Sequence, residues 1–256
     1  MLLSACYNRV RVPAVCPLLK PLRPILCYVT DRRSLPLSTS ADSHHLLLDS
    51  IGNAAAAGAD WIQLREKDYS GREWARLVKE SLERVKRTGS SARILVNDRL
   101  DVALACKAGG VHLSENGLPV ADACRLRDDF FAASAQPPDF LVGLSCHSLG
   151  AALGAARAGA DYIYFSPIFF TPSKANYGPP QGVERLARIC AAVDIPVIAI
   201  GGVTVENAPE CFCAGASGIA AIRLFQESIG TMSQTVDSLH RQGLRGDDGR
   251  SRSPRV

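Results

Sequence analysis

Eight short apolar runs alternate with eight alanine- and leucine-rich segments along most of this chain. The apolar runs are 25–30, 61–65, 93–97, 110–113, 141–145, 162–167, 196–201 and 218–223. The segments that follow them have the 3.6-residue spacing of helices, at 43–57, 71–87, 99–108, 119–130, 148–158, 182–193, 205–214 and 227–242. Apolar runs without alternation are typical of strands buried on both faces, hence of a parallel sheet. Eight such units in about 220 residues predict an α/β protein built as a single (β/α)8 TIM barrel.

An open, doubly wound sheet is the main alternative to a barrel. That fold normally carries a glycine-rich turn after its first strand, whereas this chain has Thr30-Asp31-Arg32-Arg33 there. We therefore expect one barrel domain over residues 25–242. Residues 1–24 are basic and lack the apolar block and cleavage site of a secretory signal, so they predict a disordered extension. The polar residues 243–256 predict a disordered tail.

The composition argues against nucleic-acid and membrane partners. The formal net charge is only +4, and much of the basic excess lies near the two ends. A nucleic-acid-binding face would need clustered cations with aromatic or groove-reading partners. No apolar run approaches the roughly 20 residues that a membrane-spanning helix needs. Nine cysteines without a disulfide pattern indicate reduced thiols and favour a cytoplasmic protein, and the sequence leaves a homo-oligomer open.

Polar and mainly cationic residues stand where the predicted strands end. The carboxyl ends of barrel strands meet at one face, and the chemistry of such proteins gathers there. The residues at these positions are Asp31, Arg32, Gln63, Arg65, Lys67, Asn97, Asp98, Arg99, His112, Ser145, Cys146, His147, Thr171, Lys174, Gly201, Gly202 and Arg223. Arginine and lysine bind phosphate oxygens, and adjacent glycines let backbone N–H groups approach an anion closely. The rim therefore predicts a small ligand that carries phosphate.

A series of motifs follows the predicted strands along residues 25–230. The motifs are Tyr28-Val29-Thr30-Asp31-Arg32, Gln63-Leu64-Arg65-Glu66-Lys67-Asp68, Val96-Asn97-Asp98-Arg99, Gly110-Val111-His112-Leu113, Gly143-Leu144-Ser145-Cys146-His147, Ser166-Pro167-Ile168-Phe169-Phe170-Thr171 and Ile200-Gly201-Gly202-Val203-Thr204. In content and order they resemble the thiamine phosphate synthase and thiazole tautomerase superfamily, and as a set they identify the chain as a member of it.

The resemblance implies a reaction and a binding site for its first substrate. In the synthases, an aminopyrimidine diphosphate ionises to a stabilised cation, and the nitrogen of a thiazole phosphate captures that cation. The products are thiamine phosphate and diphosphate. Carried over to this chain, Gln63 would hydrogen-bond the aminopyrimidine, and Asp98 would ligate Mg²⁺. The diphosphate would be contacted by Arg65, Lys67 and Asn97.

The same resemblance implies roles for residues on the later strands. Ser145 would lie beside the reacting pyrimidine, and Lys174 would act near the diphosphate and the thiazole from a loop that closes over the substrate. Thr171 would bind in the same region. The backbone amides at Gly201 and Gly202 would take the thiazole phosphate.

Two positions depart from the synthase pattern. A second metal-binding aspartate is expected after the fourth strand, and Gly117 stands at that position. Glu115 and Asn116 are the alternative oxygen ligands in the segment, but neither is at the expected position. Mg²⁺ binds reluctantly without carboxylates, so its affinity should be weaker with Asp98 alone. Arg223 aligns with a phosphate-binding serine after the eighth strand and would pair with phosphate in its place.

These departures keep two other functions open. The tautomerase branch isomerises a thiazole carboxylate phosphate without diphosphate, and the histidine that shuttles its proton matches His147. An imidazole near its usual pKa can take and return a proton at neutral pH, although a structural role for His147 is an equal alternative. A protein that binds phosphate ligands on the same barrel without catalysis is the third hypothesis.

Four neighbouring residues have structural interpretations. Asp98 could instead be the N-cap of the following helix. Glu66 should support its neighbours from the opposite face of the strand. We expect His112 to orient nearby loops, and Cys146 to be structural because neither reaction needs a thiolate.

Overall fold

The computed structural model describes residues 23–35, 43–133, 139–171, 179–228 and 230–245. Residues 1–22 of the predicted extension lie outside the described residues, as do Lys174 and residues 246–256 of the predicted tail. Arg23 and Pro24, which the sequence assigned to the extension, are described and pack against the barrel end. Arg23 forms an ion pair with Asp60, at 2.6 Å between its guanidinium and the carboxylate oxygen.

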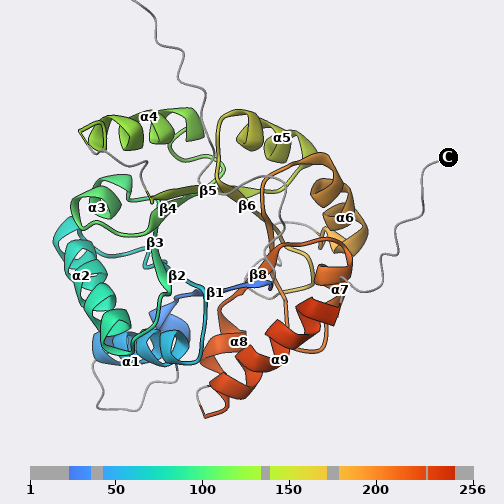
Figure 1. Cartoon of the computed structure of the whole chain (residues 1–256), viewed down its shortest axis with the longest axis horizontal. Helices are drawn as coiled ribbons and strands as arrows, with labels where there is room; N and C mark the ends of the chain where they lie inside the picture. The colour runs from blue at the N-terminus through green and yellow to red at the C-terminus, as the bar shows by residue number, and fades with distance from the viewer. Residues whose placement is uncertain (1–22, 36–42, 134–138, 172–178, 229, 246–256) are drawn as a thin grey trace, which may run out of the picture.

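Eight parallel strands close into a barrel in the order of the sequence (Figure 1). The strands are β1 (Ile25–Val29), β2 (Trp61–Leu64), β3 (Arg93–Asn97), β4 (Gly110–Leu113), β5 (Leu141–Cys146), β6 (Tyr162–Phe165), β7 (Val197–Ile200) and β8 (Gly218–Ala221). The ring closes where β8 pairs with β1 in parallel. Each predicted run coincides with one strand, which confirms the (β/α)8 barrel.

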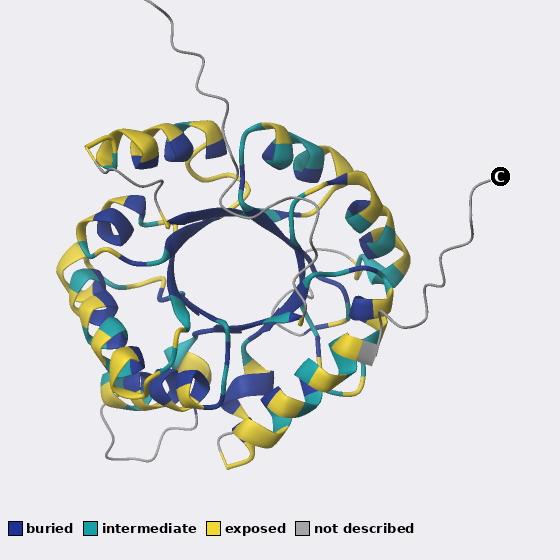
Figure 2. Ribbon diagram, viewed as in Figure 1, coloured by how far each residue is buried: buried dark blue, intermediate teal, exposed yellow. Residues whose placement is uncertain are grey.

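An outer layer of helices surrounds the strands, and its buried residues face the barrel while its exposed residues face outward (Figure 2). The helices are α1 (Ser43–Ala56), α2 (Gly71–Arg87), α3 (Leu100–Ala105), α4 (Val120–Phe130), α5 (Leu149–Arg157), α6 (Gly182–Ala192), α7 (Ala208–Cys213), α8 (Arg223–Gln226) and α9 (Met232–Arg245), with a 3-10 turn η1 (Arg32–Ser34) after β1.

The C-terminal helix differs from its prediction. Instead of one helix over 227–242, the short α8 begins directly after β8 at Arg223, and α9 continues to Arg245. Packing explains the extension, since Val236 and Leu239 are fully buried and a Cβ on Gly243 would lie 2.3 Å from Pro24 Cγ. Burial of this apolar face holds residues 243–245 in the helix despite their polar neighbours in sequence.

The core has two parts, one inside the barrel and one between the barrel and the helices. Inside the barrel, Leu95 and Ile198 are 0% exposed, and they pack with the rings of Tyr162 and Tyr164. Burying one such aliphatic side chain contributes about 1.5–3 kcal/mol. The filled interior closes the barrel below the rim, so a ligand would approach from the carboxyl ends of the strands.

A capping box fixes the start of α2, just after the predicted phosphate-binding motif of β2. The Ser70 hydroxyl accepts a hydrogen bond from the Glu73 amide at 3.4 Å, and the Glu73 carboxylate accepts one from the Ser70 amide at 2.7 Å. Such caps stabilise a helix by about 0.5–2 kcal/mol. The chain between β2 and α2 is therefore anchored at both ends.

Two further predictions concern the whole fold. Within the described ranges, no helix is long and apolar enough to cross a membrane. All seven cysteines in the described part of the chain are free thiols.

Candidate active site

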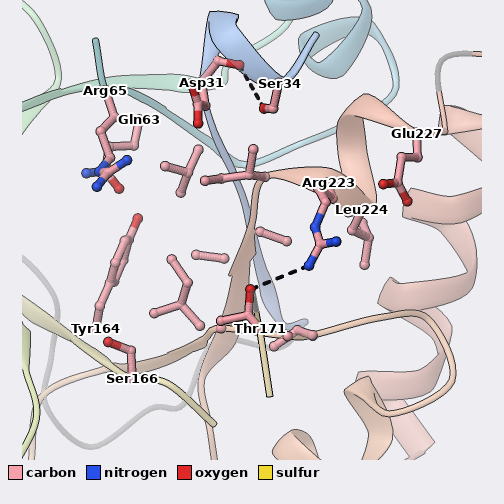
Figure 3. Close-up of a pocket in the computed structure, with 18 of the residues that line it drawn as sticks. Asp31, Ser34, Gln63, Arg65, Tyr164, Ser166, Thr171, Arg223, Leu224 and Glu227 are labelled. Carbon is pink, nitrogen blue, oxygen red and sulfur yellow. Dashed lines mark hydrogen bonds between the residues drawn. The ribbon is translucent and has the colours of Figure 1, made fainter. Parts of the chain in front are cut away.

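A pocket of about 780 Å³ opens at the carboxyl ends of the strands (Figure 3). The predicted site residues that line it are Gln63, Arg65, Lys67, Asn97, Ser145, Thr171, Gly201, Gly202 and Arg223. They come from β2, β3 and β5 and from the segments that follow β2, β6, β7 and β8, so the barrel brings together groups that are far apart in the sequence. Asp98 and His147 lie beside the pocket but do not line it.

A buried amide pair forms part of the pocket wall. Gln63, 2% exposed, donates from Nε2 to Asn97 Oδ1 at 2.7 Å. Among the described residues, Gln63 Oε1 has no hydrogen-bond partner although it is buried. A buried polar atom without a partner is costly, so this oxygen marks the place of a ligand donor or a water molecule.

A buried carboxylate supports the cationic loop after β2. Glu66 is 3% exposed and accepts hydrogen bonds from the Thr30 hydroxyl at 2.9 Å and the Arg32 guanidinium at 3.0 Å. Thr30 Oγ1 in turn accepts from the Arg65 amide at 2.9 Å. Burial raises the pKa of Glu66, while the hydrogen bonds from Thr30 and Arg32 oppose that shift. Glu66 therefore supports its neighbours, as predicted.

The cations of the pocket fall into two groups. Arg32 pairs with Glu66 and also with Asp68, whose pKa Arg32 holds well below its usual range. Arg65, Lys67 and Arg223, by contrast, form no ion pair with a carboxylate of the described residues. Arg65 lies across the pocket from Arg223 (Figure 3). Positive charge on two facing walls, without a carboxylate partner in the described part of the chain, suits an anion with two charged ends.

The wall opposite β2 combines glycine backbone with a hydroxyl and a guanidinium. Gly201 and Gly202 have φ angles of 101° and 68°, a region that favours glycine. A Cβ on Gly202 would lie 2.4 Å from the Phe170 carbonyl oxygen, so only glycine fits there. Arg223 donates to the Thr171 hydroxyl at 3.4 Å (Figure 3). The turn and these two side chains form a second polar surface for an anion.

Asp98 sits at a tight, left-handed turn beside Gly117. Its φ is 58°, which is unfavourable for a residue other than glycine, asparagine or aspartate. Its carboxylate accepts from the Ser114 amide at 2.7 Å and the Asn97 amide group at 2.8 Å. The N-cap of α3 is Arg99 instead, without a side-chain cap bond, so the N-cap interpretation of Asp98 is wrong.

The geometry explains why position 117 matters for a metal ion. A Cβ on Gly117 would lie 3.3 Å from Asp98 Oδ1, so a carboxylate there would stand next to Asp98. The described residues contain no group of three metal-ligating side chains. Glu115 is engaged elsewhere, since it pairs with His147. This donor set fits a Mg²⁺ ion shared with ligand phosphates, not one that the protein holds alone.

His112 lies in the barrel interior and does not orient loops as predicted. It is 2% exposed, and burial followed by the charge of Arg65 lowers its pKa to about 3. Its Nε2 lies 2.9 Å from Ser145 Oγ, and its Nδ1 lies 3.1 Å from the Tyr162 hydroxyl. The ring is neutral at physiological pH, and it holds Ser145 at the edge of the pocket.

His147 reaches the pocket through another residue. Its Nδ1 pairs with Glu115, and its Nε2 lies 3.3 Å from the hydroxyl of Ser166, which lines the pocket. Cys146 is fully buried, and burial raises the pKa of its thiol to about 12. It is therefore inert at neutral pH, consistent with the structural role predicted for it.

Sequence reasoning missed Tyr164 and Ser166 as pocket residues. A period of two would have found them, because alternate residues of a strand share one face. Tyr162 and Tyr164 both point into the barrel, and Ser166 follows in the same register at the rim.

The fold and the rim together define a (β/α)8 barrel protein with a cationic, amide-bearing mouth suited to phosphorylated small molecules. The chain belongs to the thiamine monophosphate synthase family, whose model matches residues 34–225. It is 46% identical over 170 residues to a thiamine-phosphate synthase of Methanoculleus marisnigri, covering 66% of this chain and 75% of that protein. With a putative thiamine-phosphate synthase of Geobacter sulfurreducens it shares 44% identity over 176 residues, 69% and 78% of the two chains.

A solved structure has the same fold. The thiamine phosphate pyrophosphorylase from Pyrococcus furiosus superposes with a TM-score of 0.68 at 30% identity, covering 86% of this chain and 96% of that one.

Proposed function

We propose that this chain is a thiamine-phosphate synthase of thiamine biosynthesis. It would couple an aminopyrimidine diphosphate with a thiazole phosphate and release diphosphate. The family and the relatives at 44–46% identity support this function. The observation that carries it is a pocket lined by Arg65, Lys67, Arg223 and the buried oxygen of Gln63. Among the described residues, the three cations pair with no carboxylate, and the oxygen with no donor, that would compete with a phosphorylated ligand.

Each substrate has a complementary part of the pocket. Gln63 Oε1 would accept a hydrogen bond from the exocyclic amine of the pyrimidine, which satisfies the buried oxygen. Arg65, Lys67 and Asn97 would bind the diphosphate. The Gly202 turn, with Gly201, Thr171 and Arg223, would bind the thiazole phosphate on the facing wall.

In the reaction, the bond from the pyrimidine methylene carbon to the diphosphate oxygen breaks, and the thiazole nitrogen forms the new bond to that carbon. Arg65 and Lys67 stabilise the negative charge on the leaving diphosphate, and the two phosphate sites align the substrates. Ser145 would stand beside the reacting carbon. Lys174, proposed to close over the substrates, lies outside the described residues.

Mg²⁺ is proposed as an ion bound together with the diphosphate. Asp98 would be its carboxylate ligand, and the diphosphate oxygens and waters would complete its shell. When bound, the ion would neutralise part of the diphosphate charge.

Thiazole tautomerase is a second candidate because His147 is held by Glu115 and contacts Ser166 at the pocket edge. The Ser166 hydroxyl lies between His147 Nε2 and the pocket, so a proton could pass from His147 to a ligand through Ser166. The partners are proposed to be small phosphorylated molecules, without nucleic acid. A cytoplasmic location and a homo-oligomer stay predictions.

One set of assays separates these functions. Purified protein is incubated with both synthase substrates over a range of Mg²⁺ concentrations, and thiamine phosphate and diphosphate are quantified. We expect equal amounts of both products. A failure to form thiamine phosphate at any Mg²⁺ concentration would reject the synthase. Isomerisation of thiazole carboxylate phosphate that is lost in His147→Ala would support the tautomerase, and binding of thiazole phosphate without turnover would support a non-catalytic binder.

A further inference from the structure

Three neighbouring strands place a histidine, a glycine and a tyrosine in one row inside the barrel. His112 of β4 pairs with Gly143 of β5, and Gly143 pairs with Tyr162 of β6. A Cβ on Gly143 would lie 2.0 Å from Tyr162 Cζ, so the tyrosine ring fills the space that any other side chain would need. Because of this gap, Tyr162 reaches across β5, and its hydroxyl oxygen lies 3.1 Å from His112 Nδ1.

Aromatic rings pack against both residues of this contact. The centroid of the Trp61 ring lies 4.7 Å from that of Tyr162, and the Tyr164 ring lies 3.9 Å from that of His112. Tyr162 and His112 are 1% and 2% exposed. The row continues from His112 Nε2 to Ser145 Oγ, at 2.9 Å, and thus connects a sealed tyrosine to a hydroxyl that lines the pocket.

The number of protons in this row decides the direction of its hydrogen bonds. Tyr162 and His112 are both almost fully buried, and the partners of the two His112 ring nitrogens are hydroxyl groups and not carboxylates, so the ring is neutral with one N–H and the phenol keeps its O–H. Among the described residues, His112 Nδ1 is the hydrogen-bond partner of the Tyr162 hydroxyl. A buried O–H needs an acceptor, and Nδ1 can accept only if the ring proton is on Nε2.

We propose that Tyr162 is a positioning residue that holds His112 as the Nε2–H tautomer, so that Ser145 accepts from the ring and turns its own hydroxyl hydrogen toward the ligand. The opposite tautomer would make Nε2 an acceptor for Ser145 and prepare the serine as a nucleophile. The row therefore makes Ser145 a hydrogen-bond donor to a ring nitrogen or phosphate oxygen of the ligand, and not an attacking group. The effect of this Ser145 orientation on turnover rests on the proposed synthase function.

The tautomer is measurable in the unmodified protein. Ring ¹⁵N chemical shifts are recorded on histidine-labelled protein, with His112 assigned through contacts to the Tyr162 and Tyr164 rings. We expect a neutral ring with its proton on Nε2 that does not titrate between about pH 5 and 8. A proton on Nδ1 overturns the proposal. Tyr162→Phe should shift or broaden these signals, whereas Cys27→Ala, which removes a buried interior contact to Tyr164, should leave them in place.

A double-mutant cycle tests the consequence for Ser145. Tyr162→Phe should lower kcat about tenfold with little change in KM, and should have less than about a twofold effect when Ser145→Ala is already present. Equal losses in both backgrounds would show a structural role only and overturn the positioning role. If the wild-type protein has no synthase activity, the proposed function fails, while the ring-nitrogen measurement still decides the tautomer.

Discussion

The end of β2 and the corner between β3 and β4 contribute differently to the rim. At β2, the buried Glu66 takes up the charge of Arg32, so Arg65 remains without an ion-pair partner in the described structure and faces the pocket. At the corner, Asp98 supplies one carboxylate, and Gly117 occupies the position from which a second carboxylate would lie next to it. The first region is supported by the protein, and the second requires oxygens from a ligand.

This difference follows from the cost of burying charge. Glu66 is 3% exposed and is satisfied by a hydroxyl and a guanidinium, so it can support a rigid loop. Asp98 is exposed, and its two oxygens accept one N–H each. The buried hydrogen bonds of Glu66 thus support the loop that is proposed to bind phosphate, whereas a metal ion would depend on the substrate.

The largest effect is expected from Arg65→Ala. Loss of this guanidinium removes a pocket charge from a residue whose backbone amide is held by the Thr30 hydroxyl, so kcat/KM should fall about 100- to 1000-fold. Steady-state kinetics with the pyrimidine diphosphate varied would measure the loss. Arg76→Ala is the matched control, since Arg76 pairs with Glu80 on the exposed face of α2 and should change kcat/KM less than about twofold. Equal losses in both variants would contradict the binding role of the β2 end.

The corner is tested by adding the carboxylate it lacks. Gly117→Asp places a second carboxylate beside Asp98 and should lower the Mg²⁺ concentration for half-maximal activity about tenfold. The measurement is a Mg²⁺ titration of product formation at saturating substrates. Gly117→Asn has the same size without the charge and should leave the midpoint near that of the wild type. An unchanged midpoint in Gly117→Asp would mean that no ion binds at this corner.

The pH dependence of stability tests the buried histidine His112 of β4, next to the corner between β3 and β4. His112 is neutral when folded, with a pKa of about 3, and it gains a proton more easily when unfolded. Stability is therefore unaffected by this group above about pH 6.5 and falls by about 1.4 kcal/mol per pH unit below it, until the pH approaches the folded pKa. Urea unfolding at several pH values should show that the free energy of unfolding of His112→Asn depends less steeply on pH than that of the wild type.

The sequence predicted the barrel and most of the pocket for one physical reason. Apolar runs report burial on both strand faces, and in a parallel barrel every strand end lies on the same rim, so Arg65 and Gly202 could be placed together without knowing any contact. The side on which Asp98 would lie could not be predicted in this way, because it depends on a turn with a φ of 58°. Nor could the contact from His112 to Tyr162, since it depends on the missing side chain of Gly143 in the strand between them.

The smallest effect concerns the phosphate wall opposite β2. In Arg223→Ser, the Gly202 turn and Thr171 remain, so the KM for thiazole phosphate should rise only about fivefold, or ~1 kcal/mol, with kcat nearly unchanged. Arg223→Lys keeps the charge without the planar guanidinium, so its KM for thiazole phosphate should lie between those of the wild type and Arg223→Ser. Kinetics at saturating pyrimidine diphosphate would measure these changes. A loss as large as that of Arg65→Ala would show that each wall depends on its own arginine. The proposed difference, in which the Gly202 turn and Thr171 compensate for Arg223 but nothing compensates for Arg65, would then be wrong.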